Sequence, residues 1–147
     1  MELKITSNKI FAPLKNKELV LTPEERVRQE YICRLVNHYG YDLSQMEQEL
    51  QVNNSRRGQG KARADIVVWK SASAKSNDDA ATIVVECKAE HITIREEDYF
   101  QGYNYAAWAG ADFFVTTNLK ETRVFKVNKN KLPKHLEEIV DIPKAEE

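Results

Sequence analysis

The sequence holds few cysteines and no excess of charge of either sign, and both shortages limit what the protein can be. Its two cysteines, Cys33 and Cys87, lack a partner at the short spacing that is typical of zinc sites and redox motifs. So little cysteine fits a reducing cytoplasm. Lysine and arginine together number 22 and aspartate and glutamate 23, which gives a formal net charge of −1. This near neutrality argues against nucleic acid coating the whole surface.

Several signatures of targeting and catalysis are also missing from the sequence. Residues 1–4 contain no apolar signal core, and the longest stretch that is poor in charge, residues 100–119, is interrupted by Asp112. We therefore expect a protein without a membrane segment or an export signal. Because no glycine-rich phosphate loop, nucleophile elbow or His-x-x-x-His pair occurs, several enzyme classes lose their usual sequence support.

What the sequence does contain is the material for one folded domain. A chain of 147 residues is long enough to bury roughly two-thirds of its surface on folding, so its core needs no disulfide or metal. We expect an N-terminal arm or hairpin over residues 1–21, one domain over residues 22–130, and a polar C-terminal tail or linker over residues 131–147.

The hydrophobic pattern predicts two helices and several strands. Thr22 as the N-cap, Pro23 at the first helical position and Glu25 closing a capping box predict a helix start. This helix should run to about Tyr39, because Gly40 favours a left-handed C-terminal cap. Further predicted elements are strands over residues 64–69, 82–88, 112–117 and 122–127, a helix over 96–109, a strand or frayed helix over 47–52, and a solvent loop over 70–80. The order predicts an α/β fold in which helices flank a mixed sheet.

Two neighbouring strands of this prediction carry charges that buried strands seldom tolerate. Asp65 opens one strand, whereas Glu86 and Lys88 close the next and share a face because alternate strand residues point the same way. An ionised group removed from water costs several kcal/mol unless it is paired or binds a metal. If the strands pair, Asp65 can join the other two residues at one site.

Two converging carboxylates favour a shared cation, and Mg²⁺ is the natural one because it prefers oxygen ligands and keeps several waters. Asp65 and Glu86 would supply carboxylates and Cys87 its main-chain carbonyl, while the Cys87 side chain points to the opposite face. Lys88 would activate a water or stabilise charge on a phosphate under attack. The alternative is that Asp65 caps its strand while Glu86 and Lys88 form an ion pair at a sheet edge.

The spacing from Asp65 to the Glu86-Cys87-Lys88 tripeptide resembles the PD-(D/E)xK nuclease signature. The span from Thr22 to Val127 resembles, more specifically, the N-terminal nuclease domain of type I restriction enzyme R subunits. The segments that carry this resemblance are Thr22 to Gln29, Arg63 to Val68, Val84 to Ala89, Gln101 with Tyr105, and Thr116 to Asn118. It implies a restriction-endonuclease-like three-layer core of αβββαβ order. Leu119 stands where the family commonly has glycine.

The resemblance also implies roles for individual residues. Asp65 and Glu86 would bind the divalent ion, Lys88 would serve catalysis, and Gln101 and Tyr105 on the second helix would support the site and the DNA. A glutamate of the first helix often joins such metal sites. Glu24 is the better candidate because Glu25 already has a task in the capping box, although Arg28 could simply pair with Glu24 on the helix surface. Tyr105 could likewise be a core residue and Gln101 a solvated one.

Basic residues are concentrated between Arg56 and Lys75, where six of them stand against one acid for a local net charge of +5. Arg56, Arg57, Lys61 and Arg63 could therefore contact DNA phosphates, which supply affinity without sequence information. An ordinary solvated loop is the alternative. Residues 76–100 carry seven acids and two bases, so the near-zero net charge of the chain results from a basic segment and an acidic segment that cancel.

Together these features predict a Mg²⁺-dependent DNA endonuclease domain of a type I-like restriction R subunit, or a stand-alone relative, with Mn²⁺ as a possible substitute ion. Expected partners are double-stranded DNA, modification and specificity subunits, and a translocase domain that this sequence lacks. One alternative is a catalytically inactive DNA-binding or assembly module of a restriction-modification complex. Another is a small α/β metal hydrolase with a substrate other than nucleic acid.

Overall fold

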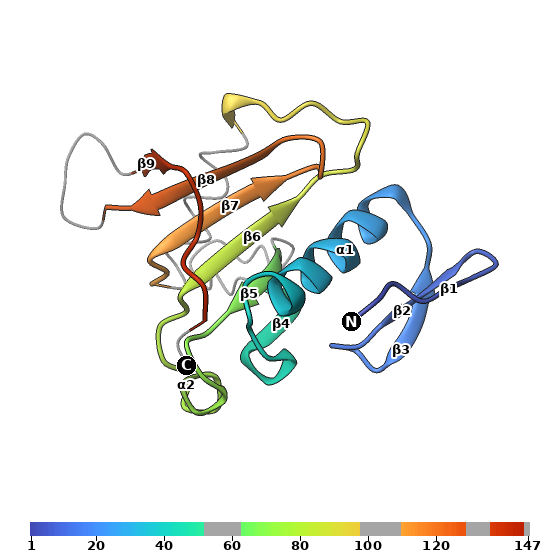
Figure 1. Ribbon diagram of the computed structural model, residues 1–147, viewed down its shortest axis with the longest axis horizontal. Helices are drawn as coiled ribbons and strands as arrows, with labels where there is room; N and C mark the ends of the chain where they lie inside the picture. The colour runs from blue at the N-terminus through green and yellow to red at the C-terminus, as the bar shows by residue number, and fades with distance from the viewer. Residues whose placement is uncertain (52–62, 98–109, 129–135, 146–147) are drawn as a thin grey trace.

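A six-stranded mixed sheet forms the centre of the fold (Figure 1). The computed structural model describes residues 1–51, 63–97, 110–128 and 136–145. In spatial order the strands are β4 (Met46–Gln51), β5 (Arg63–Val68), β6 (Ile83–Cys87), β7 (Phe113–Thr117), β8 (Thr122–Val127) and β9 (Leu136–Ile139). Only β6 and β7 are parallel; the other neighbours run antiparallel. The sheet confirms the predicted α/β, restriction-endonuclease-like fold class.

The helix α1 (Pro23–Asn37) packs on one face of this sheet, against β5 and β6 (Figure 1). Its apolar residues recur at helical spacing, so they form one buried stripe. Tyr31 and Leu35 lie in this stripe and share a core cluster with Ile66 and Val85 of the strands. Gly40, just beyond the helix, has φ +81°, the left-handed conformation that the sequence predicted for it.

The N-terminal residues form a small antiparallel sheet of their own beside α1 (Figure 1). Its strands are β1 (Ile5–Thr6), β2 (Lys9–Ala12) and β3 (Lys17–Val20). In β2, Ile10 and Ala12 are fully buried, whereas Lys9 is exposed and Phe11 is half-buried. This alternation shows that one face of the small sheet packs against the rest of the domain.

The structure corrects the predicted tail over residues 131–147. β9 pairs with β8 in register Val124↔Ile139, so this segment adds the last strand of the central sheet. Ile142 is buried in the core cluster under α1, and Pro143 accepts a hydrogen bond from the Tyr41 hydroxyl at 2.9 Å. A few apolar residues among many charges are enough to attach an edge strand. The sequence did not predict this strand because the segment as a whole is polar.

Two other predicted segments differ from the structure or lie outside it. Residues 70–80, predicted as a loop, contain the short helix α2 (Ala72–Ser76), whose N-cap Ser71 accepts a hydrogen bond from the Ala74 N–H. A 3₁₀ turn (Leu43–Gln45) also precedes β4. Of the helix predicted over 96–109, only residues 96–97 are described, and they are helical. None of the described helices is long and apolar enough to cross a membrane.

Candidate active site

The candidate residues of the two central strands lie at one end of the β5–β6 pair. The last register pair on this side is Ile66↔Val85, so one further step sets Asp65 opposite Glu86. The Asp65 carboxylate bridges the strands there, because its Oδ2 accepts a hydrogen bond from the Cys87 N–H at 2.7 Å. Asp65 therefore fixes the end of β6 by a side-chain bond where the main-chain ladder stops.

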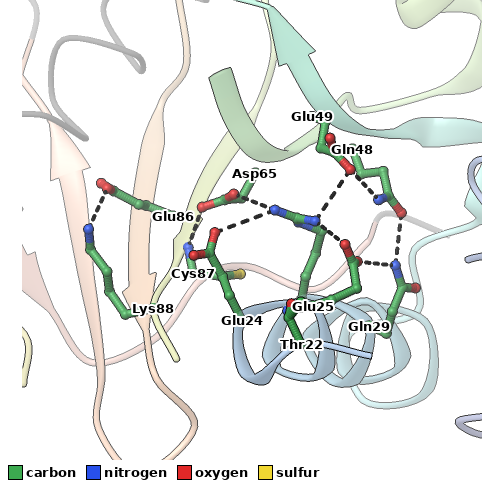
Figure 2. Close-up of polar contacts among 11 residues, drawn as sticks. Thr22, Glu24, Glu25, Gln29, Gln48, Glu49, Asp65, Glu86, Cys87 and Lys88 are labelled. Atoms are coloured by element: carbon green, nitrogen blue, oxygen red, sulfur yellow. Dashed lines mark hydrogen bonds and ion pairs between the residues drawn. The ribbon is translucent and has the colours of Figure 1, made fainter. Parts of the chain in front are cut away.

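Glu86 and Lys88 form the predicted same-face pair on β6. Lys88 Nζ lies 3.4 Å from Glu86 Oε1 (Figure 2), and Glu86 is only 5% exposed. The Lys88 N–H donates to the Thr117 carbonyl at 2.9 Å and continues the pairing with β7. The predicted ion pair is therefore present. It does not lie at a sheet edge, as the alternative without a metal site predicted, because β6 runs between β5 and β7.

Arg28 of α1 is the centre of a second charged group, which we call the arginine cluster: Arg28, Glu24, Glu25, Glu49 and Asp65. Its Nη1 donates to Glu25 Oε1 and lies 3.4 Å from Glu49 Oε1, whereas its Nη2 donates to Asp65 Oδ1 at 2.9 Å and lies 3.5 Å from Glu24 Oε1. The Arg28 side chain is only 9% exposed. One buried guanidinium thus ties α1 to both β4 and β5.

The cluster extends through amides on its far side (Figure 2). Gln29 Nε2 donates to Glu25 Oε2 at 2.8 Å and to Gln48 Oε1 at 2.9 Å, and the Gln48 amide in turn donates to Glu49 Oε1 at 3.2 Å. Gln29 and Gln48 are almost fully buried. These bonds fix the rotamers of Glu25 and Glu49, so the Nη1 side of Arg28 is firmly anchored.

This network corrects the capping box predicted for the helix start. Thr22 Oγ1 does accept the Glu25 N–H at 3.0 Å, but the Thr22 N–H donates to the Val20 carbonyl. The Glu25 carboxylate, free of a capping task, turns toward Arg28 and Gln29 instead. The Glu25 carboxylate pairs with Arg28, three residues further along the same helix, because the Arg28 guanidinium is buried and needs a partner.

The site carries an excess of negative charge. With all groups ionised, the carboxylates of Glu24, Glu25, Glu49, Asp65 and Glu86 outnumber the two cations Arg28 and Lys88, which leaves a local charge of −3. Burial raises the pKa of Glu24, and the neighbouring charge of Asp65 raises it further. Burial acts to lower the pKa of Arg28, but the charge and hydrogen bond of Asp65 and the charge of Glu25 outweigh it and raise that pKa.

The oxygen-rich donor set suits a hard cation such as Mg²⁺. Asp65 and Glu86 offer carboxylates from adjacent strands, and Glu24, at the start of α1, pairs with the same Arg28 nitrogen as Asp65 (Figure 2). Within the described ranges, no three or more histidine, cysteine, aspartate or glutamate side chains lie close enough to hold a metal ion together. Mg²⁺ is commonly held by one or two carboxylates and several waters, so the residues present fit it.

Five of the residues predicted for the site lie in one region of the structure. Glu24, Asp65, Glu86, Cys87 and Lys88 lie where α1 and β5 begin and β6 ends, and the Cys87 side chain is buried in the core as expected. Outside the described residues lie Gln101, Tyr105, Arg56, Arg57 and Lys61, together with the side chain of Arg63.

The sequence predicts Arg28 only as a surface partner of Glu24, whereas in the structure it lies at the centre of a buried cluster. A signal was present in the helix itself. Arg28, Tyr31, Ile32 and Leu35 follow the spacing i, i+3, i+4, i+7, which places Arg28 on the apolar face. An arginine on that face needs carboxylates beside it to compensate its buried charge, so the pattern predicts acidic partners for Arg28.

The fold and the site define an α/β domain of the restriction-endonuclease-like class. A comparison with protein-family models then identifies the family: the model described as "Type I restriction enzyme R protein N terminus (HSDR_N)" matches residues 23–143. The chain belongs to this family. Searches of curated proteins and of solved structures gave no significant match.

Proposed function

We propose that this protein is a Mg²⁺-dependent DNA endonuclease domain of a type I restriction system, carried by an R subunit or a stand-alone relative. Membership of the R protein family supports the restriction role. The observation that supports a cleavage activity is that Asp65 lies opposite Glu86 and bonds to the Cys87 N–H, between the two members of the Glu86–Lys88 pair. Two carboxylates and a lysine in this arrangement suit phosphodiester hydrolysis.

Each residue has a distinct task in this proposal. Asp65 and Glu86 would hold Mg²⁺ with the main-chain carbonyl of Cys87, and Glu24 would add a further carboxylate. The bound ion supplies Lewis-acid activation of the phosphate and a lowered pKa of water. Lys88 keeps its ammonium beside Glu86, where it would orient the attacking water or stabilise negative charge on the phosphate.

The proposed partners follow from the restriction role. Double-stranded DNA would be the substrate, and Gln101, Tyr105, Arg56, Arg57, Lys61 and Arg63 remain proposed support and DNA contacts. Modification and specificity subunits and a translocase domain would select and deliver the DNA. Such a system would act in the cytoplasm, where the DNA is.

Plasmid nicking tests the proposal. We expect the wild-type protein to nick supercoiled plasmid with Mg²⁺ or Mn²⁺, and Asp65→Asn and Lys88→Ala to lose this activity. Matched controls are Asp78→Asn and Lys120→Ala, which remove the same charges at exposed positions and should cleave like the wild type. Equal nicking by all five proteins would contradict the site, because a contaminating nuclease explains it better.

A second candidate, the inactive DNA-binding or assembly module, is favoured by one specific observation. Both oxygens of Asp65 already have protein partners, Arg28 and the Cys87 N–H. Calorimetry separates the two functions. An active site should bind Mn²⁺ in a way that depends on Glu86, whereas a module kept for docking would bind DNA but give no such Mn²⁺ signal.

A further inference from the structure

Arg28 divides the acidic groups around it into two sets. Its Nη1 faces Glu25 and Glu49, which the amides of Gln29 and Gln48 also hold. Its Nη2 faces Asp65 and Glu24. The first set is anchored within the protein fold, whereas the second consists of the two carboxylates proposed as cation ligands on this side of the site. The Arg28 guanidinium thus joins the anchored set, Glu25 and Glu49, to the set proposed to bind the ion, Asp65 and Glu24.

The Nη2 half occupies the place where a cation would act. Asp65 Oδ1 lies 2.9 Å from Arg28 Nη2 in a charge-assisted hydrogen bond. A divalent ion drawn to Asp65 meets this positive charge nearby, and the two repel each other strongly in a partly buried site. The ion and the guanidinium therefore compete for the same carboxylate charge.

We propose that Arg28 is a built-in counter-cation of the site, a positioning residue that neutralises Asp65 and Glu24 until a divalent ion takes them over. The inference rests on the proposed function, since it concerns the same ion. On cation binding, Nη1 keeps its contacts with Glu25 and Glu49, so α1 stays attached while the Nη2 contacts weaken. The arrangement keeps the acidic site stable when empty and lowers its affinity for the ion.

Calorimetric titration with Mn²⁺ and thermal unfolding test this role. Arg28→Met removes the charge but keeps a long apolar side chain. We expect it to lower the Tm of the cation-free protein, to bind Mn²⁺ roughly tenfold more tightly, and to show a larger Tm rise on adding Mn²⁺ than the wild type. The matched control is Arg26→Met, which removes the same charge from an exposed position of α1 and should bind Mn²⁺ like the wild type.

Unchanged or weaker Mn²⁺ binding by Arg28→Met, with wild-type binding that depends on Asp65, would overturn the counter-cation role and make Arg28 an organiser of the ligands. Should Arg28→Met fail to fold, Mn²⁺ titration of Arg28→Lys provides the same test. A single ammonium cannot contact both sets of carboxylates, so we expect this variant also to bind Mn²⁺ more tightly than the wild type. A wild-type protein that binds no Mn²⁺, or binds it equally well as Asp65→Asn, would contradict the proposed function itself.

Discussion

Two charged groups meet at the same end of the central sheet, and they are built differently. The arginine cluster joins α1, β4 and β5 through a buried guanidinium with several short contacts. The Glu86–Lys88 pair lies at the end of one strand, β6, and its two side chains are 3.4 Å apart. Contacts between elements far apart in sequence hold a fold together, whereas a pair on one strand adds little to it.

This difference suggests two separate roles, and Asp65 connects the two groups because it bonds to both Arg28 and the Cys87 N–H. The cluster joins three elements of the fold, while the Lys88 side chain is 26% exposed, as its proposed role in cleavage requires. Substitutions in the cluster should therefore change stability most, and substitutions in the pair should change cleavage most. Four variants test this comparison, in order of decreasing expected effect.

Glu25→Ala should have the largest effect on stability. It removes the acceptor of both Arg28 and Gln29 and leaves a buried charge short of a partner. Breaking such a pair costs about 3–5 kcal/mol of unfolding free energy, which denaturant titration measures. Glu30→Ala, on the same helix but outside the cluster, is the control and should stay within about 0.5 kcal/mol of the wild type. Similar losses in both variants would contradict the structural role of the cluster.

Lys88→Ala should show the opposite behaviour. We expect plasmid cleavage to fall by about 10²–10³-fold, the usual loss when one group that stabilises the transition state is removed. The free energy of unfolding should fall by less than in Glu25→Ala, because the Lys88 side chain is partly exposed and water can replace part of its contact with Glu86. A large loss of stability without a specific loss of cleavage would assign Lys88 to the fold instead of the chemistry.

Thr22→Ala probes how far the helix start supports the cluster. The variant loses the N-cap bond from Thr22 Oγ1 to the Glu25 N–H, and helix capping is worth about 1 kcal/mol. Thr22→Ser keeps the hydroxyl and should restore most of that stability in thermal unfolding. If Ser and Ala behaved alike, the cap would have no part in holding Glu25 in place.

Glu24→Gln should have the smallest effect, and its sign depends on pH. Burial, and then the charge of Asp65, raises the pKa of Glu24 above its ordinary value near 4.5. The folded state thus holds this proton more tightly, so ionising Glu24 costs stability as pH rises through its folded pKa. Because the Glu24 side chain is half exposed, the variant should gain no more than about half a kcal/mol at pH 7. Below pH 4 the variant and the wild type should have the same free energy of unfolding. A variant that is less stable than the wild type at pH 7 would contradict the prediction.

The sequence predicted those parts of the fold and site that depend on local pattern. The helix from Pro23, the strands that carry Asp65 and Glu86, and the shared face of Glu86 and Lys88 all follow from short-range spacing. Alternation in strands and the helical period act over a few residues, so one sequence suffices to recognise them.

The features that the sequence did not predict depend on contacts between distant segments. The β9 strand exists because residues 136–139 pair with β8, and Arg28 is buried because Glu49 of β4 and Asp65 of β5 reach it from other parts of the chain. Leu119 lies between these cases. Its φ of +75° is a left-handed conformation that favours glycine, the residue expected there from the resemblance, but sequence alone could not show that leucine adopts this conformation.

The most direct test of the proposed cation site is a crystal soaked in Mn²⁺ and measured for anomalous scattering. We expect an anomalous peak between the carboxylates of Asp65 and Glu86, with Arg28 drawn back on its Nη2 side. The absence of a peak at saturating Mn²⁺, or a peak held by other residues while Asp65 stays on Arg28, would contradict the proposed site.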